Sequence, residues 1–461
     1  MSALRERERA SLPCLAVAGA LVLSACGRPR GGPDVLLVVI DTLRADHVGC
    51  YGYPRDTTPN VDGLARTARR YEIALAPAPW TGSSVASIFT GLHPSSHGLL
   101  TNAAPLGEEA LASDFLAPRA VTLAERFSKA GYRTAAVVSN PWLKSRYGYA
   151  QGFDRFEELP SKAAAGPVTS AAIERIEEFR RAENEAPYFL YVHYMDAHGP
   201  YDPDPPFDSM FRSPEARLLS DKEWAAVEPY LREGEDRDLN AYIDRYDGGI
   251  RQCDEQIGRL LLALGPRIAS TVVVVTADHG EEFFEHGRAG HGYTLFEEMI
   301  RVPLVIKAPG APPSVVAWPE FASLVDLAPT IAALAGLKAD PDDFEGRDLS
   351  SGSPPPPESW SENHTKGSRL HGARRRDSKI LYSENDDELV AWYELVLDPR
   401  ESKSILQFSP PALAERERNR FREHIARCRE RREKFTRGFA PPDRPADPAD
   451  VADLERIGYV K

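Results

Sequence analysis

Residues 35–41 read Val-Leu-Leu-Val-Val-Ile-Asp, and residues 271–278 read Thr-Val-Val-Val-Val-Thr-Ala-Asp. Unbroken β-branched runs of this length are typical of strands that are buried on both faces, as in parallel sheets. In open α/β sheets, ligands bind just beyond the carboxyl ends of such strands. Asp41 and Asp278, with His279 next to the second, are therefore placed to bind a divalent cation. The alternative is that each aspartate only caps the helix that follows it.

The rest of the chain alternates between short apolar runs and amphipathic stretches. Strands are expected at residues 134–139, 188–193 and 302–307. Helices are expected at residues 61–71, 84–89, 120–130, 170–181, 241–264 and 324–335. This alternation predicts an α/β fold in which a mostly parallel sheet is flanked by helices. We expect this catalytic domain to span residues 34–350.

A break in composition follows the predicted domain. Residues 351–357 read Ser-Gly-Ser-Pro-Pro-Pro-Pro, which is typical of a linker. We expect residues 358–461 to form a smaller subdomain with a short antiparallel sheet, including strands at 379–382 and 389–397. Residues 411–437 predict a highly charged helix, whose arginines are expected to form a solvated face and not a binding patch.

Composition limits the classes of function. The chain has 461 residues, of which 42% are hydrophobic and 27% charged, which is ordinary for a globular protein. Its formal net charge of −13 argues against a nucleic-acid partner. No apolar run is long enough to span a bilayer. No protein partner can be read from the sequence.

The N-terminal residues have the pattern of a secretory signal. Three arginines precede an apolar stretch at residues 12–23, and Leu23-Ser24-Ala25-Cys26 resembles a bacterial lipobox. This predicts a lipoprotein signal peptide at residues 1–25, lipidation of Cys26 and a flexible tether at residues 26–33. The protein is then expected in the bacterial cell envelope, lipid-anchored on the periplasmic or cell-surface side. The alternative is an ordinary secretory signal cut after Ala25.

The remaining cysteines do not define a disulfide framework or a metal site. Cys50, Cys253 and Cys428 are odd in number and lack the spacing of a metal site. A disulfide among them is possible but cannot be assigned, and none is expected to be catalytic.

A series of motifs runs in order along nearly the whole chain and resembles the sulfatase family of the alkaline phosphatase superfamily. The motifs are residues 41–47 with 50–53, 80–91, 152–154, 193–198, 277–280, 290–292, 302–304 and 393–395 with 398–399. The resemblance implies an alkaline-phosphatase-like sheet and a hydrolase of sulfuric or phosphoric esters. The expected substrate is a small-molecule or glycan ester.

The nucleophile motif departs from the family pattern. Sulfatases normally read Cys-x-Pro-Ser-Arg before the Thr-Gly pair, and the cysteine is oxidised to formylglycine. Here Thr81 stands at the cysteine position, Ser83 at the proline position and Val85 at the arginine position. Hydrated formylglycine has two hydroxyls, so its ester can collapse to the aldehyde. Threonine has only one, so its ester must be broken by a new attack, which favours phosphate esters.

The implied set of metal ligands also favours phosphoryl chemistry. Lipoteichoic acid synthases and phosphoethanolamine transferases of the same superfamily use a threonine nucleophile, with a metal held by an acid, that threonine and an Asp-His pair. The matching residues in this chain are Asp41, Thr81, Asp278 and His279. Three oxygens and one nitrogen suit Ca²⁺, Mn²⁺ or Mg²⁺, with Zn²⁺ less favoured.

The implied mechanism needs a histidine. Thr81 attacks in line, a histidine protonates the leaving alcohol, and water or a second alcohol releases the covalent intermediate. His198 and His291 match family positions and are the candidates, although a lone histidine is commonly structural.

Other residues near the motifs have weaker assignments. Arg44 is expected either to steady the metal loop or an ester oxygen, or to form an outward ion pair. His97 and His193 are expected to support the metal ligands. Three residues of the loop after the strand at 134–139 are expected at the surface: Trp142, Lys144 and Arg146.

Three functions follow as hypotheses. The leading one is a metal-dependent hydrolase with Thr81 as nucleophile. The second is a transferase that moves a phosphorylated headgroup to an envelope glycan or lipid, although such transferases usually carry membrane spans. The third is a non-catalytic binding lipoprotein on the same fold, which Val85 keeps open because the family's arginine braces the nucleophile.

Overall fold

A computed structural model describes residues 32–101, 114–181, 186–232, 236–316, 321–338, 340–365, 367–440 and 452–453. The predicted signal peptide, the lipidation site Cys26 and most of the predicted tether lie outside the described residues. No helix within the described part of the chain has the length and apolar character needed to cross a bilayer.

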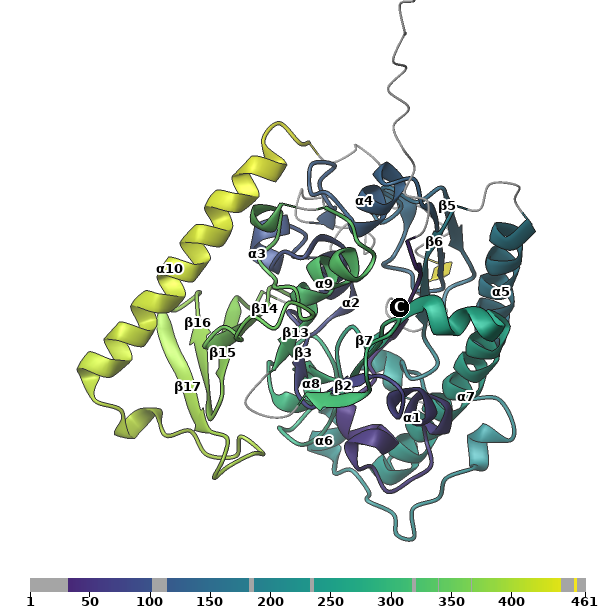
Figure 1. Cartoon of the computed structure of the whole chain (residues 1–461). Coiled ribbons are helices and arrows are strands. Elements are labelled where there is room, and N and C mark those ends of the chain that lie inside the picture. Colours follow the sequence, from purple (N-terminus) through teal and green to yellow (C-terminus); the bar gives the residue numbers. More distant parts are fainter. Residues whose placement is uncertain are drawn as a thin grey trace, which may run out of the picture.

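An eight-stranded sheet forms the centre of the molecule (Figure 1). Its strands, in spatial order, are β12 (Ser314–Val316), β2 (Arg69–Tyr71), β11 (Leu304–Lys307), β7 (Thr271–Ala277), β1 (Asp34–Ile40), β6 (Tyr188–Tyr194), β4 (Arg133–Val138) and β5 (Arg155–Glu158). All neighbours are parallel except β11, which is antiparallel to both β7 and β2. The prediction of a mostly parallel sheet is therefore confirmed.

Helices cover both faces of this sheet (Figure 1). One layer contains α1 (Pro59–Ala65), α5 (Ala165–Arg181) and α7 (Leu239–Leu264). The other contains α2 (Thr81–Thr90), α4 (Leu123–Lys129) and α9 (Leu327–Leu334). Shorter elements complete the domain: α3 (Pro94–His97), α6 (Asp221–Ala226), α8 (Glu297–Ile300), β3 (Ala74–Leu75), β8 (Glu282–Phe283), β9 (Ala289–Gly290), β10 (Arg301–Val302) and β13 (Ala322–Ser323).

Local sequence signals explain where α4 begins and where α2 ends. Thr122 and Glu125 form a reciprocal capping box at the start of α4, which satisfies two backbone donors. Gly91 ends α2 in the left-handed conformation, with φ at 70°, which glycine adopts without strain.

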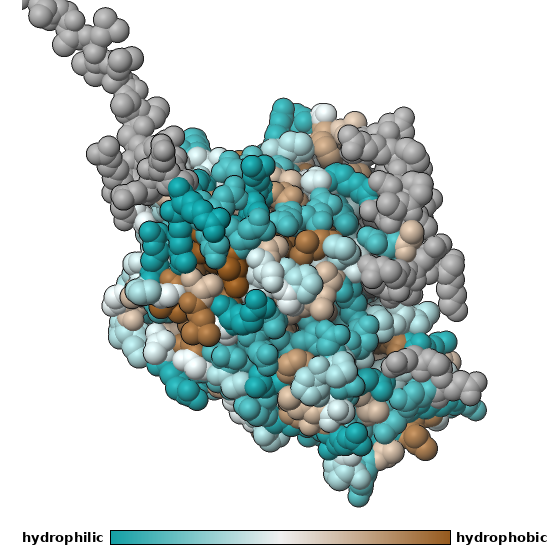
Figure 2. All heavy atoms as spheres, turned by 90° about the vertical axis from the view of Figure 1, so that its right-hand side faces the viewer, coloured by the Kyte–Doolittle hydropathy of each residue, from teal (hydrophilic) through white to brown (hydrophobic). Residues whose placement is uncertain are grey.

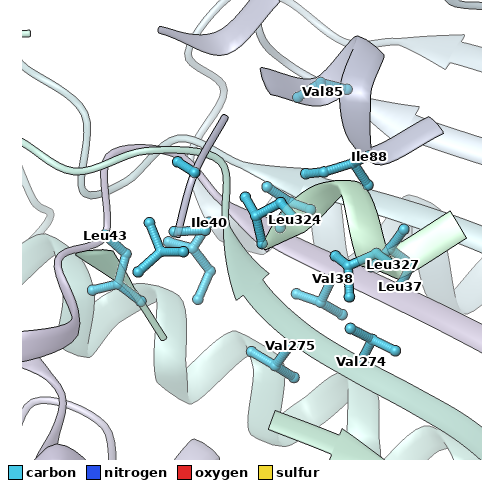
Figure 3. Packing of buried hydrophobic residues seen from close by; sticks show 14 of the residues in the cluster. Leu37, Val38, Ile40, Leu43, Val85, Ile88, Val274, Val275, Leu324 and Leu327 are labelled. Carbon is cyan, nitrogen blue, oxygen red and sulfur yellow. The ribbon is translucent and has the colours of Figure 1, made fainter. Parts of the chain in front are cut away.

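The core lies on both faces of the two central strands. All residues of β1 after Asp34 are buried, and β7 is buried throughout. Figure 3 shows the side chains of β1 and β7 beneath Val85 and Ile88 of α2 and beside Leu324 and Leu327. Two-sided burial explains why these strands are continuous apolar runs and do not alternate. The surface is different: the face that carries α5 and α7 is mainly hydrophilic with scattered apolar patches (Figure 2).

A second, four-stranded antiparallel sheet follows residues 351–357, which form neither helix nor strand. Its strands are β14 (Glu358–Asn363), β15 (Leu370–Arg375), β16 (Ser378–Ser383) and β17 (Glu388–Glu394). The long helix α10 (Pro411–Thr436) lies along this sheet (Figure 1). Phe421 and Ile425 of α10 pack against Ile380, Tyr382 and Trp392. The predicted antiparallel subdomain with a charged helix is therefore present.

Two predicted elements differ from the structure. The helix expected at residues 61–71 ends at Ala65, and Arg69–Tyr71 forms β2, because this segment pairs with β11 and β12 from far along the chain. The strand expected at residues 302–307 is two strands, β10 and β11, in different sheets. Pro303 separates them, since proline cannot donate to the ladder.

Candidate active site

The register of the central strands brings Asp41 and Asp278 together. Strands β1 and β7 are parallel neighbours, with Ile40 paired to Ala277. Asp41 and Asp278 are the next residues of each strand, so they leave the sheet at the same level. Both side chains are fully buried. This position beyond the carboxyl ends of the strands is where the sequence predicts a ligand site.

The two carboxylates and His279 have the arrangement of a cation site. Asp41 Oδ1 and Asp278 Oδ2 are buried without a hydrogen-bond partner. His279 Nε2 lies 3.6 Å from each of these oxygens. Its Nδ1 lies 2.9 Å from the carbonyl of Gly280, which favours the tautomer whose Nε2 lone pair faces the carboxylates. Because buried carboxylates are costly unless they are compensated, these residues fit a divalent cation.

The charges of the two aspartates are coupled. Burial and the negative charge of Asp41 raise the pKa of Asp278 to about 6. Burial opposes ionisation of Asp41 as well, but its hydrogen bond with His193 and the nearby histidines together hold its pKa below the usual range. Two carboxylates this close repel each other, which a cation between them would relieve.

A set of hydrogen bonds orients Asp41. Its Oδ2 accepts from Asn140 Nδ2 at 2.6 Å and lies 3.1 Å from His193 Nε2. The Tyr191 hydroxyl lies 2.8 Å from His193 Nδ1, so tyrosine can donate there and leave Nε2–H to donate to Asp41. The prediction places His193 in this supporting role. Asn140 is absent from the predicted site residues, and because amides have no metal or acid signature, only its place after β4 pointed to it.

Thr81 is the first residue of α2, beside these groups. Its Oγ1 lies 3.4 Å from Asp41 Oδ2 and 3.4 Å from His279 Nε2. The N-terminus of a helix favours negative charge, because its first backbone N–H groups are unpaired and its dipole is positive there. Gly82 is required at the next position, since a Cβ there would lie 2.3 Å from the ring of Trp80.

Val85 lies in the apolar core and not in the site. It is fully buried and sits one turn before Ile88 in the part of α2 that faces the central strands (Figure 3). The position at which the family carries an arginine therefore provides no charge here.

A row of histidine rings extends from these candidate cation ligands. The ring of His291 lies 4.6 Å from that of His279, and the ring of His198 lies 5.0 Å from that of His291. Burial lowers the pKa of His198 to about 4, which favours a neutral ring. Both predicted histidines are therefore next to the predicted ligands.

Glu281 is a buried acid that sequence reasoning missed. Its Oε1 lies 3.0 Å from His291 Nδ1, and its Oε2 accepts from the Tyr201 hydroxyl at 2.9 Å. Burial raises its pKa to about 7. The signal was its place three residues after Asp278, within the same loop.

Of the weaker candidates, His193 contacts Asp41 directly, and the others lie outside this cluster. Arg44 forms ion pairs with Asp46 and Glu285, and its Nη1 donates to the Glu281 carbonyl. Arg44 therefore steadies the loop that follows Asp278. His97 bonds Ser87 within the core at 3.0 Å. The three loop residues are less exposed than predicted: Trp142 is buried, Lys144 pairs with Glu158, and Arg146 lies over the ring of Tyr147.

The three cysteines of the described chain, Cys50, Cys253 and Cys428, are free thiols.

Comparison with known proteins gives consistent matches. The family model described as Sulfatase matches residues 33–337. An arylsulfatase from Clostridium perfringens is 22% identical over 458 residues, covering 81% of this chain and 90% of that protein. A structure solved with its substrate D-glucosamine-2-N,6-O-disulfate superposes with a TM-score of 0.68 at 20% identity, covering 90% of this chain and all of that one. A phosphonate monoester hydrolase from Agrobacterium radiobacter superposes with a TM-score of 0.66 at 21% identity, over 87% and 96% of the two chains.

Proposed function

This chain belongs to the sulfatase family, and from that premise we propose that it is a metal-dependent hydrolase of sulfate or phosphate esters with Thr81 as its nucleophile. The observation that carries the proposal is the place of the Thr81 hydroxyl. It lies at a helix N-terminus, within 3.4 Å of both Asp41 and His279. A nucleophilic oxygen needs a group that activates it and a positive field for the charge that develops. Both are available at this position.

The proposed metal ligands are Asp41, Thr81, Asp278 and His279. Their oxygens and single nitrogen suit Ca²⁺, Mn²⁺ or Mg²⁺, with Zn²⁺ less favoured. Bound there, a divalent ion would lower the pKa of the threonine hydroxyl and neutralise charge on the ester oxygens.

The residues of the chain then divide the reaction into two displacements. Thr81 Oγ1, whose proton has been released to solvent, forms a bond to the sulfur or phosphorus atom while the bond to the leaving oxygen breaks, and a histidine gives that oxygen a proton. Water then attacks the same atom, loses a proton to the histidine and releases Thr81 as the alkoxide that begins the next cycle. The sum is one ester and one water converted to an alcohol and sulfate or phosphate.

His291 is the better placed proton donor. Its Nδ1 faces the carboxylate of Glu281 at 3.0 Å, an arrangement that fixes the ring and leaves Nε2 to exchange a proton with the substrate. The ring of His198 is oriented differently, because its Nδ1 contacts the backbone carbonyl of Gly199. We therefore assign His198 to contact with the ester oxygens.

The choice between sulfate and phosphate depends on Thr81. A threonine ester cannot collapse by elimination and must be hydrolysed directly, which favours phosphorus. Similarity to an arylsulfatase supports sulfate, and similarity to a phosphonate monoester hydrolase supports a phosphorus ester. Solved relatives with sulfated sugars make a glycan ester a reasonable substrate class.

We also propose that the protein is held in the bacterial cell envelope through lipidated Cys26. The lipobox-like residues 23–26 support this. A Cys26→Ser variant is expected to leave the membrane fraction; a variant that stays with the membrane would contradict the proposal.

Hydrolysis of paired nitrophenyl esters tests the proposed activity. The panel is a phosphate monoester, a phosphodiester, a phosphonate and a sulfate, each with Ca²⁺, Mn²⁺, Mg²⁺ and Zn²⁺. We expect metal-dependent turnover that Thr81→Ala and Asp278→Ala abolish. Thr90→Ala is the matched control, because it removes another buried hydroxyl from α2 and should leave turnover intact.

Two results would contradict the hydrolase proposal. A wild-type protein that binds metal but hydrolyses none of the four esters would favour a transferase that needs its own acceptor. A wild-type protein with neither metal nor turnover would favour a binding protein, as the valine at position 85 allows.

A further inference from the structure

A second cluster of potential metal ligands lies at the junction of the C-terminal sheet and the catalytic domain. Glu362 is the second-last residue of β14, while His424 and Cys428 are one turn apart on α10 and so share one face of the helix. All three are buried, with 1%, 5% and 1% of their surfaces exposed. One ligand atom from each lies within 4.8 Å of the other two.

The distances match those of a tetrahedral ion. His424 Nε2 lies 3.5 Å from Cys428 Sγ and 3.8 Å from Glu362 Oε1. With bonds of about 2.3 Å to sulfur and about 2.1 Å to nitrogen and oxygen, tetrahedral zinc places sulfur and nitrogen about 3.6 Å apart and nitrogen and oxygen about 3.4 Å apart. These two distances are therefore within a few tenths of an ångström of those expected around one zinc ion.

An unpartnered oxygen points into the cluster. Glu362 Oε2 accepts from the Ser95 backbone and side chain and lies 2.9 Å from His364 Nε2. Glu362 Oε1 is buried without any hydrogen bond. A buried carboxylate oxygen left in this way is costly, so it calls for a positive partner. Because Oε2 already has its partners, the open side of the carboxylate is the one that faces His424.

The surroundings hold the ligands in place and leave a route to them. The ring of Trp360 stacks on that of His424 at 3.9 Å, with 5° between the planes, which fixes the imidazole. A cavity of about 590 Å³ lies beside the cluster, and His424 and His93 are in its wall.

We propose that Glu362, His424 and Cys428 bind one zinc ion, which fastens α10 to the catalytic domain through the contact of Glu362 with Ser95. On binding, the Cys428 thiol loses its proton to solvent and the thiolate bonds to the ion. Sulfur and imidazole ligands favour zinc, whereas the oxygen-rich site at Asp41 favours harder ions. The two sites therefore select different metals. The proposal does not depend on the proposed catalytic function.

Cobalt substitution tests this site specifically. We would strip the purified full chain with a chelator, add one equivalent of Co²⁺ in an Asp278→Asn background, and record the sulfur-to-cobalt charge-transfer band. Because the Asp41 site contains no sulfur, only a cysteine can give this band. We expect the band in the parent protein, which carries Asp278→Asn alone, and its loss when Cys428→Ser is added. Zinc affinity should fall at least about 100-fold in both Cys428→Ser and His424→Ala.

Matched controls separate this site from the other thiols. Cys50→Ser and Cys253→Ser remove the other two cysteines of the described chain and should keep the band. The parent spectrum needs no mutation near the cluster, so misfolding of a variant cannot hide the answer. Absence of the band in the parent protein, or its survival in Cys428→Ser, would overturn the proposal.

Discussion

Asn140→Ala is the substitution whose effect the geometry defines best. Asn140 and Asp41 are both buried, and Nδ2 of the amide donates to Asp41 Oδ2 at 2.6 Å. The other end of the amide accepts from the Trp142 backbone at 2.8 Å, which fixes its orientation. The same Nδ2 lies 3.4 Å from Thr81 Oγ1. Asn140 therefore positions the proposed nucleophile and one proposed ligand together.

The magnitude follows from the kind of hydrogen bond. A bond to a charged group contributes about 1.5–3 kcal/mol, and each 1.4 kcal/mol is a factor of ten. We expect Asn140→Ala to lower kcat/KM about 10- to 100-fold and to weaken metal binding. Asn140→Asp should lower kcat/KM further, because it would place another carboxylate 2.6 Å from that of Asp41.

The assay is steady-state hydrolysis of the preferred nitrophenyl ester, with metal affinity measured by titration of the stripped protein. Asn60→Ala is the matched control, because Asn60 Nδ2 also donates to a carboxylate, that of Asp254, at 2.9 Å, and neither residue belongs to the candidate site. If Asn140→Ala retains the kcat/KM and metal affinity of Asn60→Ala, the positioning role is wrong.

Three further predictions concern single residues. Gly82→Ala should lower activity at least about tenfold, because the new Cβ would lie 2.3 Å from the Trp80 ring and shift the start of α2; unchanged kinetics would refute the packing argument. His291→Gln should reduce turnover of alkyl esters about 10²- to 10⁴-fold but that of nitrophenyl esters far less, because only poor leaving groups need a proton; equal losses would exclude it as the acid. Burial raises the pKa of Asp196 from 3.8 to about 7, so the native state holds a proton that the unfolded state releases, and wild-type stability falls as pH rises through this window. The free energy of unfolding of Asp196→Asn should therefore rise relative to that of wild type by about 1–3 kcal/mol between pH 5 and pH 8, after allowance for the partial exposure of Asp196. Urea unfolding measures this difference, and a difference that does not change with pH would contradict the argument.

Much of the fold follows from local patterns in the sequence. The buried runs of β1 and β7 predict the centre of a parallel sheet, because only strands covered on both faces can be continuously apolar. Strand β2 was not predictable in this way. Its residues Arg69–Tyr71 become a strand only because β11 and β12 lie on either side of it, and that pairing joins segments hundreds of residues apart.

The candidate site divides in the same way. Asp41, Asp278 and His279 follow recognisable strands, so sequence reasoning places them at one edge of the sheet. Asn140 and Glu281 act through contacts with Asp41 and His291. Their places, after β4 and three residues after Asp278, are the sequence signals they carry, and position alone does not separate them from surface polar residues. Glu362 and Cys428 likewise come together only when α10 lies along the C-terminal sheet.

The most direct test of the central claim is to trap the covalent intermediate. Acid quenching during turnover of the preferred ester, followed by peptide mass spectrometry, should find one phosphoryl or sulfuryl group on Thr81 and none in Thr81→Ala. The label should also disappear when the metal is removed. A wild-type enzyme that turns over while Thr81 stays unmodified, or that carries the label on another residue, would contradict the assignment of Thr81 as nucleophile.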